Sequence, residues 1–161
     1  MEIVKLHYTK SKPVKSFSDI KAEAKEMEKL VDSEFRYGGY SEAFALSHSE
    51  VNANPFDFFV VNQKLITDKI FTDKVIINPK IISKDKSKIN MIEACMSVPF
   101  RKPKNVKRYL RIKVEYQVVD GKGLLKKKVE EIEGLKAHLF QHQIDHSLGK
   151  NIYFKSAKQN I

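Results

Sequence analysis

The sequence predicts an α+β fold in which antiparallel strands pack around a central helix. Three patterns support this prediction: helical spacing of apolar residues near the N-terminus, a strand–turn–strand pattern at residues 110–132, and a second helical stretch after Gly134. Helices at both ends with strands between them are typical of α+β proteins. No composition shift, linker or internal repeat divides the 161 residues, so residues 1–161 are expected to form a single domain.

The first helix is predicted from Ser16 to about Phe35. Ser16 is a typical N-cap residue, and Asp19 is well placed for the positive end of the helix dipole. Apolar residues then recur at helical spacing: Ile20, Ala24, Met27, Leu30 and Val31. Tyr37-Gly-Gly-Tyr40 ends the helix, and residues 41–48 after it show no clear period.

Strands are predicted in the middle of the chain. Two short ones are Phe56–Val61 and Lys74–Ile77, the second closed by Asn78-Pro79. From Leu110 to Val118 apolar and polar residues alternate cleanly, and residues 124–132 follow after the turn signal Asp120-Gly121, which predicts a hairpin.

The last helix is predicted from Leu135 to about Ser147, ending near Gly149. One face of it carries Leu135, Leu139 (or His138), His142 and His146. Two histidines four residues apart on one helix face can present both imidazoles to a metal ion. The same spacing also occurs in packed cores, and free Cys95 is equally compatible with inert packing, so these residues alone leave both interpretations open.

Composition excludes several classes of protein. A single cysteine allows no internal disulfide, no apolar run reaches membrane-span length, and the N-terminus lacks the apolar stretch of a signal peptide. We therefore expect a cytoplasmic protein with no membrane contact. The net charge of +10 comes from scattered lysines, with clusters only at Lys102–Arg111 and Lys126–Lys128. Solvated faces explain most of this charge, although it would favour a polyanionic partner.

The surroundings of Cys95 and the two histidines resemble the motifs of the peptide deformylase family. Glu93-Ala-Cys-Met-Ser97 is similar to the family's E-G-C-L-S, and His142-Gln-Ile-Asp-His146 to its H-E-x-D-H. Further segments resemble the family in the same order along nearly the whole chain: Val14-Lys-Ser-Phe-Ser18, Val75-Ile-Ile-Asn-Pro-Lys80 and Val106-Lys-Arg108. We therefore identify the chain as a divergent member.

The resemblance implies that Cys95, His142 and His146 bind one divalent metal ion, with a water in the fourth position. Three protein ligands with an open position are typical of catalytic metal sites. The family's usual metal is Fe²⁺, and Zn²⁺, Ni²⁺ or Co²⁺ can substitute. The central helix would thus be the metal-binding one.

The resemblance also assigns supporting residues. Glu93 and Arg108 match the ion pair beside the metal ligands, which we expect to orient His146. The Met96 backbone N–H would stabilise the oxyanion that forms on the substrate's carbonyl oxygen during attack by water. The family's G-x-G-L-A-A-x-Q aligns best with Ser41–His48, so that His48 replaces the glutamine that contacts the reacting carbonyl.

Three departures from the family lie where the chemistry would occur. Both glycines are missing from residues 41–48, and Ala94 replaces the glycine before the cysteine. Most important, Gln143 stands where the family has the glutamate that accepts the water's proton. Glutamine can donate or accept a hydrogen bond but cannot take up a proton, so metal binding should persist while the rate falls about 10²–10⁴-fold.

Three explanations of Gln143 remain open. The chain could be an engineered Glu→Gln trap, a naturally divergent enzyme that uses His48 as a substitute base, or a metal-containing module that binds blocked peptide N-termini without cleaving them. Drift at residues 41–48 and at Ala94 favours natural divergence. The implied function is removal of the formyl group from N-formylmethionyl peptides on nascent chains. Because only Lys150–Ile161 follow the last helix, we expect the C-terminal ribosome-docking helix of many family members to be missing or rudimentary, although the basic surface could still favour ribosomal RNA.

Overall fold

The computed structural model describes residues 9–33, 44–93 and 104–150, and within them the α+β class is confirmed. The helices are α1 (Lys21–Asp32), α2 (Gln63–Thr67), α3 (Gly134–Ser147) and the 3₁₀ turns η1 (Phe17–Asp19) and η2 (His48–Glu50). The strands are β1 (Ala45–Ser47), β2 (Phe58–Val61), β3 (Val75–Lys84), β4 (Lys88–Glu93), β5 (Lys104–Tyr109), β6 (Arg111–Val119) and β7 (Leu125–Glu133). None of the described helices is both long and apolar enough to cross a membrane.

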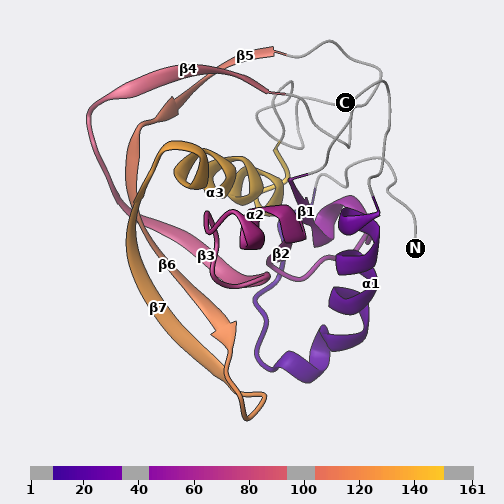
Figure 1. The fold of residues 1–161 in the computed structure, drawn as a ribbon. Helices are drawn as coiled ribbons and strands as arrows, with labels where there is room; N and C mark the ends of the chain where they lie inside the picture. The colour runs from indigo at the N-terminus through magenta and orange to yellow at the C-terminus, as the bar shows by residue number, and fades with distance from the viewer. Residues whose placement is uncertain (1–8, 34–43, 94–103, 151–161) are drawn as a thin grey trace.

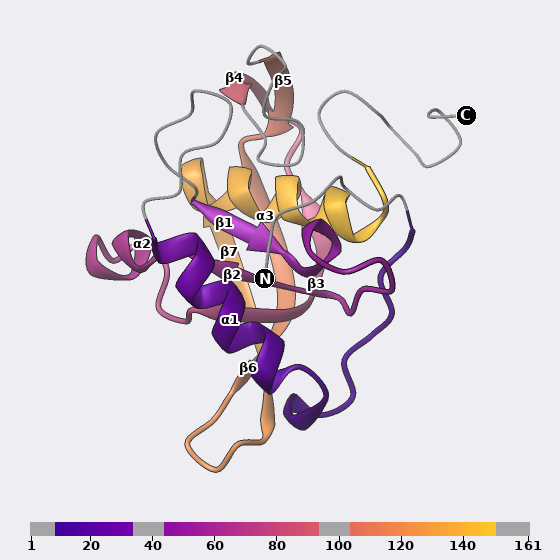
Figure 2. The same ribbon diagram turned by 90° about the vertical axis from the view of Figure 1, so that its right-hand side faces the viewer.

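The strands form two antiparallel sheets. The larger has the order β1-β2-β3-β6-β7, and β4 and β5 pair separately as a hairpin. In Figure 1 the long strands β3, β6 and β7 curve around α3, and both views place β1 and β2 between α3 and α1 (Figures 1 and 2). The prediction of antiparallel strands around a central helix is therefore confirmed.

Strand β2 connects the two halves of the core. All four of its residues are buried, and side chains of a strand alternate between the two faces of a sheet. Phe59 and Val61 accordingly join the cluster that includes α3, whereas Phe58 and Val60 join the cluster formed with α1. The continuous apolar run thus packs one helix on each face of the sheet.

Helix α3 is held at the centre by Phe140. Its fully buried ring lies 5.3–5.7 Å, centroid to centroid, from the rings of Phe59, Phe71 and Tyr116. Aromatic contacts at this separation stabilise a core beyond the area that they bury. Since both neighbouring turns of α3 are buried as well, the polar side chains on this helix must find partners inside the protein.

The predicted hairpin and helix boundaries agree with the structure to within a few residues. Strands β6 and β7 pair from Arg111 opposite Glu133 to Val119 opposite Leu125, joined by a turn that contains Asp120. The Ser16 hydroxyl accepts a hydrogen bond from the Ser18 N–H, as expected of an N-cap, although it caps η1.

The predicted strand Lys74–Ile77 does not end at Asn78-Pro79, because β3 continues to Lys84. That predicted end is therefore wrong. The pairing of β3 with β6 shifts between Ile77 and Lys80, so the proline falls in a bulge. Asn78 has a positive φ of 48° there, and its side chain bonds to both Val14 backbone groups and to Gln117. These bonds replace the ladder contacts that the bulge interrupts. The β4–β5 hairpin was not predicted.

Candidate active site

Helix α3 brings the side chains of the two predicted histidine ligands together. The rings of His142 and His146 are both buried, and their Nε2 atoms are 3.0 Å apart. The i, i+4 spacing places both residues on one side of the helix. The expectation that this helix presents two imidazoles to one point is thus met.

Each imidazole is oriented through its other ring nitrogen. His142 Nδ1 lies 2.6 Å from Glu93 Oε1, and His146 Nδ1 lies 3.1 Å from the backbone oxygen of Lys150. An ionised carboxylate and a carbonyl only accept hydrogen bonds, so each Nδ1 must carry the proton and donate it. In the neutral rings the lone pair is then on Nε2.

This tautomer places two Nε2 lone pairs toward one another across 3.0 Å. Two acceptors at that distance repel unless a cation or a proton lies between them. Neutral imidazoles whose Nδ1–H is bound to a carboxylate or a backbone carbonyl are the usual arrangement of histidine metal ligands. The donor set therefore fits a divalent metal ion.

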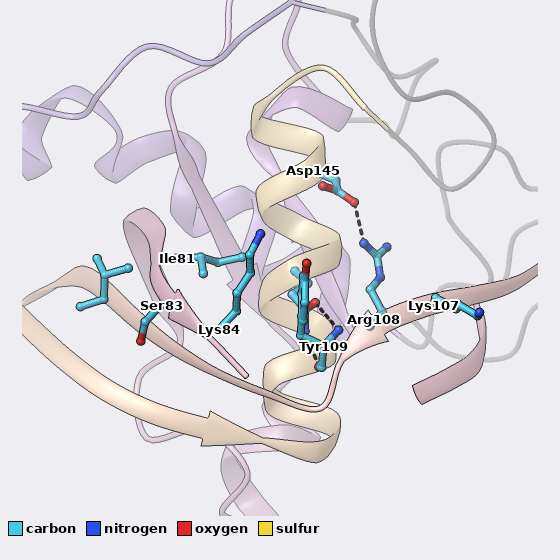
Figure 3. Close-up of a pocket in the computed structure, with 9 residues that line it drawn as sticks. Ile81, Ser83, Lys84, Lys107, Arg108, Tyr109 and Asp145 are labelled. Atoms are coloured by element: carbon cyan, nitrogen blue, oxygen red, sulfur yellow. Dashed lines mark hydrogen bonds and ion pairs between the residues drawn. The ribbon is translucent and has the colours of Figure 1, made fainter. Parts of the chain in front are cut away.

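Glu93 is the centre of a buried polar network around His142. The Arg108 guanidinium donates to both carboxylate oxygens of Glu93 at 2.8 and 2.9 Å, and His138 Nε2 lies 2.5 Å from Oε2. Arg108 Nη1 also donates to Asp145 at 2.6 Å, as the dashed line in Figure 3 shows. Together with His142 Nδ1, four nitrogen atoms thus surround the two oxygens of the Glu93 carboxylate.

Burial would raise the pKa of the Glu93 carboxyl, but hydrogen bonds from Arg108, His138 and His142 outweigh it and hold this pKa well below its usual range. Glu93 therefore stays ionised at neutral pH. The predicted pairing of Glu93 with Arg108 is present, but the expectation that it orients His146 is wrong. The carboxylate contacts His142, because β4 ends beside the middle of α3 rather than beside its C-terminus.

His138 was not singled out from the sequence as part of this site. It precedes His142 by one helical turn, so α3 carries histidines at i, i+4 and i+8 on one face. Its Nδ1 is buried and has no hydrogen-bond partner among the described residues. The four-residue spacing from His142 could have indicated that His138 belongs to the site, but the sequence predicts Leu139 or His138 on the apolar stripe of the helix.

The prediction that His48 faces the reacting carbonyl is wrong. The His48 ring is fully buried. Its Nε2 lies 2.7 Å from the Glu23 carboxylate on α1, and its Nδ1 accepts a hydrogen bond from the Phe56 N–H at 2.9 Å. The ring also packs 4.7 Å from that of Phe58. Both ring nitrogens are thus bound, one to α1 and the other to the backbone before β2, so His48 cannot serve as a substitute base.

Glu50, two residues later, is the side chain that lies beside the histidines. It is only 2% exposed, and its Oε1 is 3.8 Å from His146 Nε2. The Ser47 N–H donates to its other oxygen at 2.8 Å, which forms a capping box over η2. A signal existed in the sequence: Leu46 precedes Glu50 by four residues, as the leucine precedes the glutamine in G-L-A-A-x-Q.

Gln143 is buried on α3 at 3% exposure, and its Oε1 has no hydrogen-bond partner among the described residues. Cys95, Met96 and Ala94 lie outside the described residues, as do residues 41–43. Glu93, the last residue before the cysteine segment, contacts His142 directly. Within residues 9–33, 44–93 and 104–150, no three His, Cys, Asp or Glu side chains form a complete metal site.

Comparison with known proteins identifies the family. The model of the polypeptide deformylase family matches residues 2–160. The chain belongs to the peptide deformylase family. Its sequence is 30% identical over 146 residues to the peptide deformylase of Thermus thermophilus, which covers 85% of this chain and 70% of that protein. It is 31% identical over 140 residues to the enzyme of Thermotoga sp. (strain RQ2), with 87% and 74% covered.

Solved structures of peptide deformylases have the same fold. The Thermotoga maritima protein superposes with a TM-score of 0.72 at 27% identity, covering 92% of this chain and 88% of that one. The Plasmodium falciparum protein gives a TM-score of 0.76 at 23% identity, covering 99% and 88%. Family membership supports a hydrolase of the deformylase type, whereas the identity of the proton acceptor depends on this chain's own residues.

Proposed function

We propose that the protein is a metal-dependent hydrolase that cleaves the formyl group from N-formylmethionyl peptides. One observation carries the proposal: two buried histidines whose Nε2 atoms face each other at 3.0 Å, each with Nδ1 bound to an acceptor. The family match over nearly the whole chain supplies the substrate class. Hydrolysis would consume water and release formate and a peptide with a free N-terminal amine.

In this proposal Cys95, His142 and His146 hold one divalent ion, Fe²⁺ by resemblance, with Zn²⁺, Ni²⁺ or Co²⁺ as alternatives. Such an ion, when bound, lowers the pKa of a water and polarises the formyl carbonyl. Glu93 would keep His142 in the tautomer that binds through Nε2, and Lys150 would do the same for His146. The Met96 N–H would donate to the oxyanion.

Gln143 is the feature that opposes full activity. It occupies the family's glutamate position, and an amide cannot accept the proton of the attacking water. Loss of that transfer alone would lower the rate about 10²–10⁴-fold. Turnover well above background would therefore require another proton acceptor beside the histidines.

A second function, favoured by Gln143 alone, is a metal-containing module that binds blocked peptide N-termini without cleaving them. It would keep the ligands and the oxyanion donor and lose only the chemistry. Both proposed functions assume that residues 1–161 form a single domain. The cytoplasmic location stays a prediction.

Metal content and deformylation of formyl-Met-Ala-Ser test the two functions. The proposed enzyme contains one metal ion per chain and turns over the peptide, and Cys95→Ser abolishes both. One metal ion without turnover would contradict the enzyme and support the binding module. A protein that binds no metal under reducing, anaerobic conditions would contradict both.

We also propose that a basic surface contacts ribosomal RNA. Lys84, Lys107 and Tyr109 line a pocket of about 350 Å³ (Figure 3). The Lys84 and Lys88 amines lie 4.8 and 4.7 Å from the centre of the Tyr109 ring. Co-sedimentation with ribosomes should weaken with salt, and K84Q/K107Q should lower the logarithmic salt slope by about 2. Absence of salt-sensitive co-sedimentation would contradict the contact.

A further inference from the structure

We propose that Glu50 is the proton acceptor of this active site, in place of the glutamate that Gln143 replaces. The inference rests on the proposed deformylase function and adds a catalytic residue to it. The family has a glutamine at the end of G-x-G-L-A-A-x-Q and a glutamate in H-E-x-D-H. In this chain Glu50 would stand at the glutamine position and Gln143 at the glutamate position, so the carboxylate and the amide would have exchanged places. The carboxylate now comes from η2, and the amide from α3.

The position of Glu50 supports this role. Its Oε1 is 3.8 Å from His146 Nε2, on the side where the Nε2 atoms of His142 and His146 meet. A water between these nitrogens and a substrate would be within reach of that oxygen, since general bases act across one hydrogen bond. The capping box of η2 is enough to hold Glu50 in this position, so Glu50 need not be a metal ligand.

The carboxylate is also held in a fixed orientation. The Ser47 N–H donates to Oε2 at 2.8 Å, and the capping box connects this bond to the first turn of η2. With one oxygen bound to a backbone amide, the side chain presents the other toward His146. A buried, oriented carboxylate loses little order when it accepts a proton, as an efficient general base requires.

Other carboxylates near α3 in the described part of the chain have different partners. Glu93 receives hydrogen bonds from Arg108, His138 and His142, and Asp145 is bonded to Arg108. Asp57 accepts from the Ser147 hydroxyl at 2.6 Å. Each of these carboxylates therefore serves to hold another side chain in place.

The proton transfer balances as follows. One O–H bond of the water breaks, its proton goes to Glu50 Oε1, and the water oxygen forms a C–O bond to the formyl carbon. When the C–N bond breaks, the proton passes from Glu50 to the nitrogen that leaves as the amine. The proton that remains on the new O–H group passes to the amine, so the products are formate and the protonated N-terminus, and Glu50 is again ionised.

The first test compares Glu50→Gln with the matched control Glu130→Gln in the full-length, metal-loaded protein. Glu130 is also partly buried and hydrogen-bonded, but its partners are Tyr116 and Lys136. We expect Glu50→Gln to keep one metal ion per chain and to lower turnover of formyl-Met-Ala-Ser 10²–10⁴-fold, with the control within about threefold. Unchanged turnover in Glu50→Gln would overturn the proposal, and so would loss of the metal, which would make Glu50 a ligand.

A second readout does not depend on turnover. Acetohydroxamate releases a proton when it binds a metal ion, and a carboxylate beside the metal stabilises the complex by accepting that proton. In the Co²⁺-loaded protein, followed by its visible spectrum, Glu50→Gln should weaken acetohydroxamate binding at least tenfold. Equal binding in the two proteins would overturn the role of Glu50, whatever the activity. A loss of binding in a protein that never deformylates peptides would leave Glu50 as proton acceptor and refute the proposed function.

The exchange itself gives the last test. In the double variant E50Q/Q143E the carboxylate returns to the helix, and turnover should recover at least tenfold over Glu50→Gln. The single variant Q143E should change turnover less than tenfold, because a carboxylate is already present. A large gain in Q143E with no loss in Glu50→Gln would show that the wild-type site lacks a base.

Discussion

The two histidines of the site differ in how they are supported. His142 rests on a buried ionic network of Glu93, Arg108, His138 and Asp145, whereas His146 rests on a backbone carbonyl. The carbonyl of Lys150 reaches His146 because α3 ends in a turn at Gly149, whose φ is +76°. There the Lys150 and Gly149 N–H groups bond back to the carbonyls of Asp145 and His146.

The difference shows two ways to fix one tautomer. An ionic network requires that charges be buried, and it is strong only while every member is present. A carbonyl in a helix-terminal turn needs no charge, but it depends on a glycine and on the anchoring of the helix end. That anchor includes the hydrogen bond from the Ser147 hydroxyl to Asp57. The variants below separate these two kinds of support.

Removing Arg108 should have the largest effect. Arg108→Met leaves the Glu93 carboxylate buried without its bidentate partner, and breaking a buried pair in this way costs about 3–5 kcal/mol of unfolding free energy. The control Arg111→Met removes an ion pair with Glu133 in which both side chains are 64% exposed. That loss should be below about 1 kcal/mol. Urea denaturation measures both, and equal losses would contradict a special role for the buried network.

The His146 end should respond to pH through Asp57. Burial raises the pKa of Asp57 from 3.8 to about 6, despite its hydrogen bond from Ser147. Since the folded pKa is the higher one, the stability that Asp57 contributes is full below pH about 4 and is lost as pH rises through about 6. Asp57→Asn removes this loss, so its advantage over wild type should grow by at most about 3 kcal/mol between pH 4 and 7.

Urea midpoints at pH 4, 5, 6 and 7 measure that advantage. Asp73→Asn is the control, because Asp73 is also partly buried and paired, with Lys128. A difference between Asp57→Asn and wild type that does not change with pH would refute the predicted titration. The support of His142 should not change over this range, since the pKa of Glu93 is held low.

Glu93→Gln tests the charge of the network at the metal. The amide keeps the size of the side chain but no longer stabilises the Nδ1–H of His142 as a carboxylate does. Loss of such a partner typically weakens metal affinity 10–100-fold. Competition with a chelator measures it. Glu115→Gln, whose partners Lys80 and Lys127 are exposed, should leave metal affinity unchanged.

Gly149→Ala should have the smallest effect. An alanine at φ +76° costs about 1 kcal/mol, which should loosen the turn that brings the Lys150 carbonyl to His146. We expect a lower melting temperature and a metal affinity reduced a few-fold. Gly121→Ala is the control, because a Cβ there would meet nothing within 4 Å and its φ is not positive. If both variants behave alike, the turn does not support His146.

Much of this protein follows from local patterns in its sequence. Helical spacing indicates α1, alternation indicates the β6–β7 hairpin, and the i, i+4 histidines indicate a shared site on α3. Each of these signals is local, because it depends on the period of one element. Family motifs at Glu93–Ser97 and His142–His146 add the fold and the class of chemistry.

The contacts between distant segments were decided by the tertiary structure. Residues 41–48 have no period, so in the sequence only the spacing of Leu46 and Glu50 supports an alignment shifted by two residues. It is packing that puts His48 against α1 and Glu50 beside His146. In the same way, where β4 ends relative to α3 determines that Glu93 orients His142 and not His146. Such contacts join residues 25 to 96 positions apart, and their geometry depends on the whole core that forms between them.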